Sequence, residues 1–299
     1  MKLPFVLPSD CKQRWYSMVK EVKNPVTNDV NLILINRYNL DDILNAYAAG
    51  AITDRDILML RYLVRHKFGT AAQIAKACYH NKDTGKIKKR LSRFVKYQIL
   101  DAFTWESNSQ INGLIIYCLG PGGFRLLKSL NPDIGGWWSR HQNIRPMHEV
   151  MSFLVANEFS LKLSNDSYEF KAEPYMKFSN GKLKPTAAVI YRDSVFLLVV
   201  IRNDDMFNNF KSSLPVYNSF IEGRSWSEVY TKQPILIIIA ESDDMALSIG
   251  NYINNSSTLQ RFRFTTDERI MFRPFQKAFF TIENGLFVEK VAKIFDLSH

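Results

Sequence analysis

Helical spacing of apolar residues dominates the first 130 positions of the chain, and short polar runs divide these positions into segments. Asn39 and Thr53 stand where helices would begin, because each can cap a helix and is followed by acidic residues that suit its positive end. The predicted helices are residues 12–22, 40–50, 54–69, 71–79, 86–97 and 124–130. The predicted strands are residues 30–35, 101–106 and 114–119, of which the last two are joined into a hairpin by residues 107–113. Residues 120–123, Gly-Pro-Gly-Gly, lack the Lys-Ser/Thr of a phosphate-binding loop and are predicted as a turn.

The second half of the chain changes character, because its apolar residues form continuous runs. Residues 195–202 and 234–240 are almost wholly apolar, which is typical of strands buried on both faces. Further strands are predicted at residues 168–178, 187–191, 261–265 and 278–282, and helices at residues 148–163, 206–221 and 243–254. Strands that alternate with helices predict an α/β domain whose central mixed sheet is covered on both faces.

The net charge of the chain lies wholly in its first half. Residues 1–150 hold 22 Lys and Arg against 12 Asp and Glu, whereas residues 151–299 hold 17 of each kind. A basic module joined to a near-neutral one favours a polyanionic partner for the basic module, either nucleic acid or an anionic membrane surface. The three scattered Cys form no CxxC pair and the five His lack metal-binding spacing, so neither a disulfide framework nor a zinc site is expected.

One predicted helix, residues 86–97, separates its charges from its apolar residues. Ile87, Leu91 and Phe94 share one face, and the opposite face is almost purely cationic, with no acidic residue on the helix to neutralise it. Such a helix, between a short helix and a strand hairpin, predicts a winged helix-turn-helix in which residues 86–97 enter the major groove and residues 107–113 form the wing tip. A solvated charged face on an ordinary helix is the alternative.

The cationic residues and their neighbours at the helix start give a set of candidate DNA contacts. Cations that meet phosphates supply affinity, whereas contacts to base edges supply sequence specificity. The predicted contacts to double-stranded DNA are Lys82, Thr84, Lys86, Lys88, Lys89, Arg90, Arg93 and Lys96. Lys82, Thr84 and Lys88 are the candidates for base edges.

Four regions follow from these patterns. An N-terminal extension, residues 1–50, is expected to pack on a winged helix, residues 51–130. A linker rich in Pro, Gly and Trp, residues 131–145, then leads to an α/β domain, residues 146–299. The expected fold is therefore a two-domain α+β and α/β chain.

The stretch from Thr53 to Leu130 resembles the replication-relaxation family of plasmids and other mobile elements. The resemblance is carried by Asp56-Ile57-Leu58-x-Leu60, Thr70 to Ala77, Arg90-Leu91-x-x-Phe94-Val95, Ile99-Leu100, Tyr117-Cys118-Leu119 and Gly122-Gly123-Phe124. It is a similarity of pattern that covers roughly residues 50–225. It implies DNA binding linked to replication or relaxation of a mobile element.

The second half adds to this resemblance, because its order of strands and helices is that of the PD-(D/E)xK nuclease fold. In the family a His-bearing helix opens this domain, and His148 and Glu149 begin such a helix here. The family's Pro-Asp strand is matched by Pro185-Thr186, and its strand with two acidic residues is matched by Val200-Ile201-Arg202. The resemblance thus implies vestigial nuclease positions at Glu149, Thr186, Val200 and Arg202, and Glu173 could lie near them.

Hydrolysis by such a fold requires neighbouring carboxylates to hold a divalent metal and a Lys to orient water. Thr186 stands where Asp is needed, Val200 stands where Asp or Glu is needed, and Arg202 replaces the Lys. Glu149 and Glu173 do not rebuild the site without the missing acid. We therefore expect a degenerate restriction-endonuclease-like domain with no catalytic residue, no bound metal and no cofactor.

The expected function is that of an accessory protein of a plasmid or other mobile element. It would bind double-stranded DNA and position a protein partner of the replication, relaxation or conjugative transfer machinery. Three alternatives stay open: a winged-helix transcriptional regulator, a metal-dependent nuclease, and a protein-interaction scaffold that meets no DNA. A homodimer also stays open. No apolar run approaches the roughly 18 residues that span a bilayer and no secretory signal is visible, so a cytoplasmic protein without a membrane partner is expected.

Overall fold

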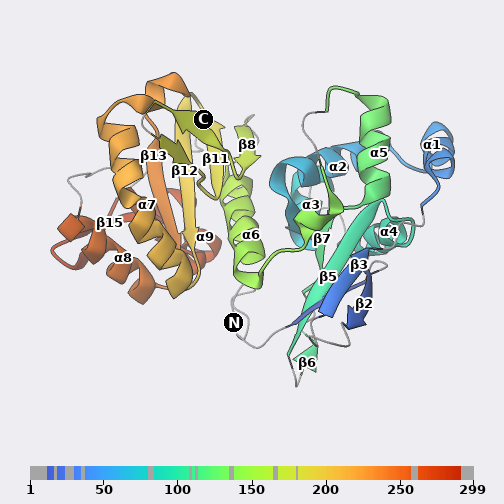
Figure 1. Cartoon of the computed structure of the whole chain (residues 1–299), viewed down its shortest axis with the longest axis horizontal. Helices are drawn as coiled ribbons and strands as arrows, with labels where there is room; N and C mark the ends of the chain where they lie inside the picture. Colours follow the sequence, from blue (N-terminus) through green and yellow to red (C-terminus); the bar gives the residue numbers. More distant parts are fainter. Residues whose placement is uncertain are drawn as a thin grey trace. The chain divides into compact units, whose positions relative to one another are not determined.

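The computed structural model describes residues 12–16, 19–23, 30–34, 38–79, 84–107, 110–111, 114–134, 138–163, 168–179, 181–256 and 262–290. Residues Leu7–Met147 and His148–His299 form two compact units, named here the N-terminal unit and the C-terminal unit. Figure 1 shows their helices and strands. Within the described ranges, no helix is both long enough and apolar enough to cross a membrane.

The N-terminal unit contains helices close to the positions that the sequence predicts. They are α1 (Leu40–Ala48), α2 (Asp54–His66), α3 (Ala71–Tyr79), α4 (Thr84–Lys96) and α5 (Pro121–Leu130). The Asn39 side chain accepts a hydrogen bond from the Asp41 N–H at 3.0 Å, and Thr53 forms a capping box with Asp56. These five predicted helices are confirmed. The turn predicted before α5 is wrong, because Pro121 occupies the first helical position, where its missing N–H costs nothing.

The strands of the N-terminal unit form an antiparallel sheet in the order β1-β5-β7-β4, with β6 paired to β5. They are β1 (Lys12–Trp15), β4 (Phe68–Thr70), β5 (Leu100–Ser107), β6 (Gln110–Ile111) and β7 (Ile116–Leu119), while β2 (Val19–Lys23) and β3 (Val30–Leu34) form a separate hairpin. The helix predicted for residues 12–22 is wrong. Pairing with β5 and β3 satisfies the backbone groups of this segment, which a short isolated helix does only marginally.

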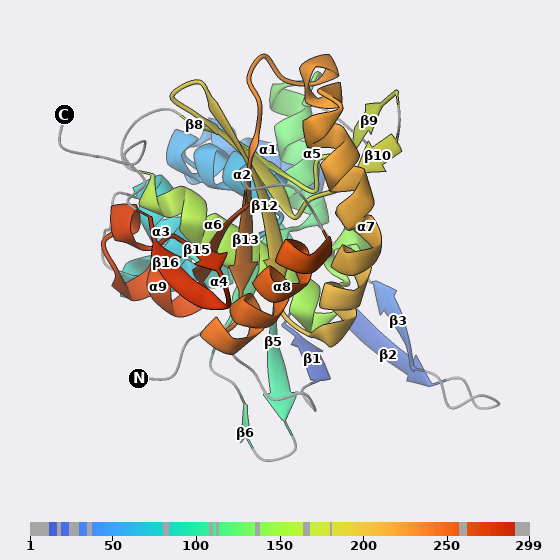
Figure 2. The same cartoon turned by 90° about the vertical axis from the view of Figure 1, so that its left-hand side faces the viewer.

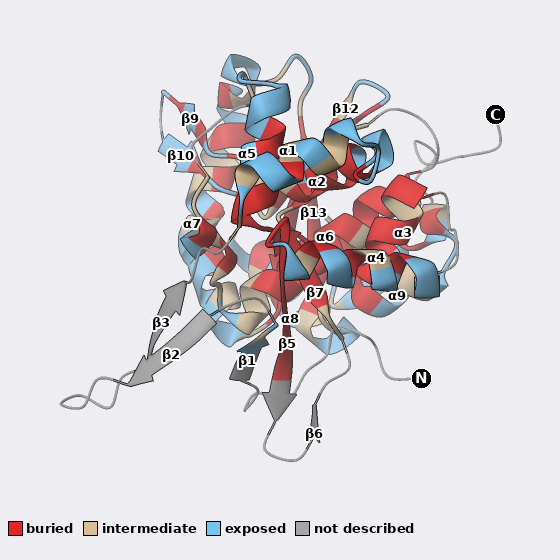
Figure 3. Cartoon of the chain, turned by 90° about the vertical axis from the view of Figure 1, so that its right-hand side faces the viewer, coloured by how far each residue is buried: buried red, intermediate tan, exposed pale blue. Residues whose placement is uncertain are grey.

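The sheet and the helices of this unit enclose one apolar core. Leu60, Ile74, Leu91 and Leu100 have no exposed surface, so α2, α3, α4 and β5 all contribute to it. Figure 3 shows β5 buried along the part for which side chains are described, and exposed residues on the outer turns of the helices. The helical stripes in the sequence therefore correspond to the buried faces of these helices.

Gly123 marks the place where the first turn of α5 lies against the backbone that follows α4. The Gly122 N–H donates to the Gln98 carbonyl oxygen at 2.9 Å, and a Cβ placed on Gly123 would lie 2.3 Å from the Ile99 carbonyl oxygen. We expect Gly123→Ala to lower the free energy of unfolding by about 1–3 kcal/mol, because backbone on both sides must shift. Urea unfolding measures this, with Lys128→Ala on the exposed side of α5 as control. An unchanged midpoint for Gly123→Ala would contradict the packing.

Part of the predicted linker is fastened to the N-terminal unit. Arg140 is buried and donates from Nε and Nη2 to the two carboxylate oxygens of Asp101, at 2.7 and 2.6 Å. Asn143 donates to the Leu119 carbonyl oxygen at 2.8 Å. A bidentate buried pair of this kind holds residues 140–143 to the sheet. The division between the units falls after Met147.

The C-terminal unit is built on a seven-stranded sheet in the order β16-β15-β14-β13-β12-β11-β8. Its strands are β8 (Tyr168–Ala172), β11 (Ala187–Tyr191), β12 (Ser194–Ile201), β13 (Ile235–Ala240), β14 (Phe262–Thr266), β15 (Phe280–Glu283) and β16 (Leu286–Glu289), and a small hairpin is formed by β9 (Met176–Phe178) and β10 (Gly181–Leu183). β12, β13 and β14 run parallel, and the other neighbours pair antiparallel. The predicted central mixed sheet is therefore confirmed.

Both faces of this sheet are covered, as its continuous apolar strands predict. The helices are α6 (Met147–Lys162), α7 (Asp204–Glu222), α8 (Asp243–Ser256) and α9 (Asp267–Phe272). Leu197 and Val199 of β12 share a core with α7 and α8, which lie in front of the strands in Figure 2. Phe196 of β12 points the other way and meets Phe159 of α6, with ring centroids 6.3 Å apart. The single strand predicted for residues 168–178 is wrong, because the chain turns at Glu173, whose φ is 46°.

Candidate nucleic-acid interface

α4 presents a row of cations to solvent. Ile87, Leu91 and Phe94 bury its apolar face in the core, as predicted. The exposed residues include Thr84, Lys86, Lys88, Lys89, Arg93 and Lys96. Five of these six are cations, and the helix carries no carboxylate to neutralise them. The resulting concentration of positive charge attracts polyanions.

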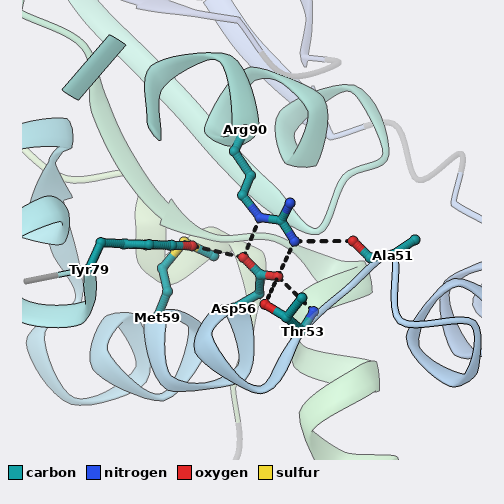
Figure 4. Close-up of polar contacts among 6 residues, drawn as sticks. All are labelled: Ala51, Thr53, Asp56, Met59, Tyr79 and Arg90. Carbon is teal, nitrogen blue, oxygen red and sulfur yellow. Dashed lines mark hydrogen bonds and ion pairs between the residues drawn. The ribbon is translucent and has the colours of Figure 1, made fainter. Parts of the chain in front are cut away.

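Arg90 differs from its cationic neighbours on α4. Its Nε donates to Asp56 Oδ1 at 2.6 Å, and its Nη2 donates to Asp56 Oδ2 and to the Ala51 carbonyl oxygen, the latter at 3.1 Å (Figure 4). The Arg90 side chain is 28% exposed. The edge of the guanidinium that would grip a phosphate is therefore occupied by a carboxylate. This geometry gives Arg90 a structural part, and its contact with DNA stays a prediction.

Asp56 is fully buried at the centre of this group. It accepts hydrogen bonds from the Thr53 N–H and hydroxyl, both at 2.7 Å, and from the Tyr79 hydroxyl at 2.8 Å (Figure 4). Burial by itself would raise the pKa of Asp56, but the hydrogen bonds from Arg90, Thr53 and Tyr79 hold it below its ordinary value. Asp56 is thus ionised at neutral pH and ties α4 to α2 and to the end of α3.

We call Asp56, Arg90, Tyr79 and Thr53 together the Asp56 clamp. In the sequence, Asp56 stands out as an acidic residue in the first turn of a helix and as the first residue of a motif that carries the resemblance. The Thr53-x-x-Asp56 spacing is a signal for the local capping box. No local signal identifies the other partners, because Tyr79 and Arg90 lie 23 and 34 residues further along the chain.

The strand hairpin predicted beside the cationic helix is present. β5 pairs antiparallel with β7, and β6 extends this edge through Glu106 opposite Ile111 and Ser107 opposite Gln110. Residues 108–109 and 112–113 of the predicted wing tip lie outside the described residues, as does Lys82. The hairpin follows α4 directly in the chain, so the order of helix and paired strands agrees with the sequence prediction.

Three of the predicted nuclease-like positions are neighbours in the C-terminal unit. The Val200 N–H donates to the Thr186 hydroxyl oxygen at 3.1 Å, and the Glu173 N–H donates to the Thr186 carbonyl oxygen at 2.9 Å. Val200 is buried, and the Glu173 carboxylate pairs with Lys184 at 2.6 Å. At the two positions that the sequence resemblance assigns to metal-binding carboxylates, the chain thus carries a hydroxyl and an apolar side chain. Glu149 lies in the first turn of α6.

Arg202 is buried in an ion pair for which the sequence carries no local signal. Its Nη1 donates to Asp267 Oδ2, and its Nη2 lies 3.9 Å from Glu241 Oε2. Burial raises the pKa of Asp267 to about 6, against the attraction of Arg202, which lowers it. This pair links the end of β12 to the start of α9, and Asp267 lies 65 residues away from Arg202 in the chain. Among the residues that the structure describes, no three His, Cys, Asp or Glu are grouped to hold a metal ion.

Comparisons with known proteins identify no family for this chain and a weak structural likeness. No family model matches the chain, and no curated protein matches it. A solved structure of the restriction endonuclease FokI bound to DNA aligns with a TM-score of 0.27 and 11% identity, covering 88% of this chain and 55% of that one. The chain thus spans about half the length of that protein. A likeness at this TM-score decides neither the fold nor the function.

Proposed function

We propose that the N-terminal unit is a winged helix-turn-helix that binds double-stranded DNA through α4. The element order α2, β4, α3, α4, β5, β7 and the strand order β5-β7-β4 support this assignment. The observation that carries it is the set of five exposed cations on α4, whose apolar face is fixed in the core. A helix of this diameter fits the major groove, and cations along it meet phosphates at the groove edges.

The exposed residues of α4 have distinct parts in this proposal. Lys86, Lys89, Arg93 and Lys96 form the cationic row that meets phosphates and supplies affinity. Thr84 and Lys88 lie in the N-terminal part of the helix, from which a recognition helix reaches base edges. Arg90 is left out of both groups because Asp56 holds it.

Salt dependence of binding tests this function. With about four phosphates neutralised, log affinity of the full chain for a fluorescent duplex should fall against log salt with a slope of about −3.6. Fluorescence anisotropy between about 50 and about 200 mM salt measures the slope. Absence of binding, or binding with a slope near zero, would contradict the proposal.

We further propose that the C-terminal unit is a degenerate restriction-endonuclease-like domain that serves as a platform for a protein partner. The order α6, β8, β11, β12, α7, β13 and the mixed sheet support the fold assignment. Thr186 and the buried Val200 support the loss of metal chemistry, since neither can supply the carboxylate that a hard divalent metal prefers.

We expect the full chain to hydrolyse no duplex DNA with Mg²⁺ or Mn²⁺. The physical reason is the missing pair of carboxylates, together with the engagement of Arg202 by Asp267. Incubation with supercoiled and linear DNA, followed by electrophoresis, measures this. Cleavage by the wild type that disappears in Glu149→Ala or Glu173→Ala would move the protein to the metal-dependent nucleases.

The accessory role in replication, relaxation or conjugative transfer of a mobile element is part of the proposal and rests on the sequence resemblance. Relaxase or replication genes beside its own gene would support that role. A footprint of the protein on its own promoter, with control of that promoter in a reporter assay, would instead favour a transcriptional regulator.

A further inference from the structure

The rotational setting of α4 decides which of its side chains meet DNA. Three buried apolar residues, Ile87, Leu91 and Phe94, define a narrow stripe along this helix. A narrow stripe of this kind tolerates some rotation about the helix axis, because apolar contacts are not directional. A directional interaction at the border of the stripe would remove this freedom.

Arg90 supplies such an interaction. It precedes Leu91, and its guanidinium lies over the Phe94 ring at 5.3 Å from the ring centroid. From there it reaches Asp56 on α2 and the Ala51 carbonyl oxygen in the turn before α2. Tyr79, the last residue of α3, donates to the same carboxylate. These contacts therefore join α4 to α2, to the turn before α2 and to the end of α3.

The position of Arg90 among the other cations of α4 also affects the repulsion between like charges on this helix. On a helix, Lys86 and Arg93 are its neighbours at four residues before and three residues after. If Arg90 were released, it would join this row, and like charges at these spacings repel one another. Neutralisation by Asp56 removes Arg90 from the row and leaves the remaining cations directed to solvent.

We propose that Asp56 is the positioning residue of the DNA-binding helix. By holding Arg90 it fixes the rotation of α4 so that the whole cationic row faces the phosphates, and Arg90 itself makes no phosphate contact. This inference rests on the function proposed above for the same helix. It adds that DNA affinity depends on a buried carboxylate that never touches DNA.

Substitution of Arg by Lys separates a clamp from a phosphate contact. A Lys keeps the positive charge but lacks the planar fork that grips both oxygens of a carboxylate. Arg90→Lys should therefore raise the Kd for duplex DNA by about tenfold, although no charge is lost. Arg93→Lys, on the same helix, should stay within about twofold of wild type because a point charge suffices for a phosphate. Arg90→Lys that binds as wild type does would overturn the proposal.

Asp56→Asn tests the other half of the clamp in the full chain. Kd should rise by about tenfold, measured at a low temperature at which circular dichroism confirms that the variant is folded. Arg90→Lys added to it should cause little further loss, because both changes break one interaction. A lower melting temperature with an unchanged Kd would show a merely structural role and overturn the proposal, as would additive losses. If Asp56→Asn does not fold, Tyr79→Phe removes a single hydrogen bond and should raise Kd by about threefold.

Hydrogen exchange of the α4 amides distinguishes failure of this inference from failure of the proposed function. Release of the clamp should speed exchange in α4 while leaving α8 of the C-terminal unit unchanged. Should the wild type bind no duplex DNA, the proposed function fails, and exchange in Arg90→Lys still shows whether the clamp orders α4. Unchanged exchange in α4 would overturn the positioning role by itself.

Discussion

Removal of three cations from α4 should lower the affinity of the full chain for duplex DNA by about 100-fold or more at about 100 mM salt. The variant is Lys89→Ala, Arg93→Ala and Lys96→Ala together. All three side chains are exposed and point away from Ile87 and Leu91, so the fold should be unaffected. Each lost phosphate contact removes about 0.9 from the salt slope, so the slope should fall to about −1.

A charge-matched variant provides the control for this experiment. Arg61→Ala, Arg65→Ala and Lys128→Ala remove three exposed cations from α2 and α5 of the same unit. The net charge of the two variants is identical, so long-range electrostatics alone would weaken both equally. We expect the control to bind within about threefold of wild type. Equal losses in the two variants would show that net charge, and not the surface of α4, governs binding.

Val200→Asp should cost the C-terminal unit about 3–5 kcal/mol of stability. Val200 is 1% exposed in β12, and its partner in β13 is the apolar Ile239. The only hydroxyl described beside its backbone is that of Thr186, and one hydrogen bond does not balance a buried charge. Urea unfolding at pH 7 measures the loss.

The loss of stability should depend on pH, and the direction of that dependence follows from the pKa of the introduced carboxyl. Burial raises the pKa of the introduced carboxyl above that in the unfolded chain, so the native state binds the extra proton near pH 5. Stability should therefore fall as pH rises above about 4, and the loss should be larger at pH 7 than at pH 4. Val200→Ala, which creates a cavity without a charge, should show no such dependence. A Val200→Asp variant as stable as wild type would indicate that position 200 opens onto a cleft.

The local sequence pattern was sufficient to predict those elements that are stabilised mainly by their own buried helical stripe or continuous apolar run. α4, β12 and β13 were predicted from such patterns, and their burial follows them. Residues 12–22 were predicted as a helix because the partner of β1 lies far along the chain, at β5, and because the local pairing of β2 with β3 was missed. β4 and β16, of three and four residues, are too short to carry a pattern of their own.

The polar contacts that fix the candidate site could not be predicted in the same way. Sequence analysis identified the exposed cations of α4 but grouped Arg90 with them, since helical phase alone places it at the edge of that face. Its engagement with Asp56 depends on how α2 and α4 pack, which no local spacing encodes. The same holds for Arg202 with Asp267, and for Arg140 with Asp101, which extends the N-terminal unit beyond the predicted boundary.

Titration of the two separated units against one duplex tests most directly whether DNA binding resides in the N-terminal unit. Residues 1–147 keep Arg140 with Asp101, and residues 148–299 keep the whole seven-stranded sheet. Residues 1–147 should bind within about threefold of the full chain and with the same salt slope, whereas residues 148–299 should not bind. Binding by residues 148–299 as tight as that of the full chain, with none by residues 1–147, would contradict the account.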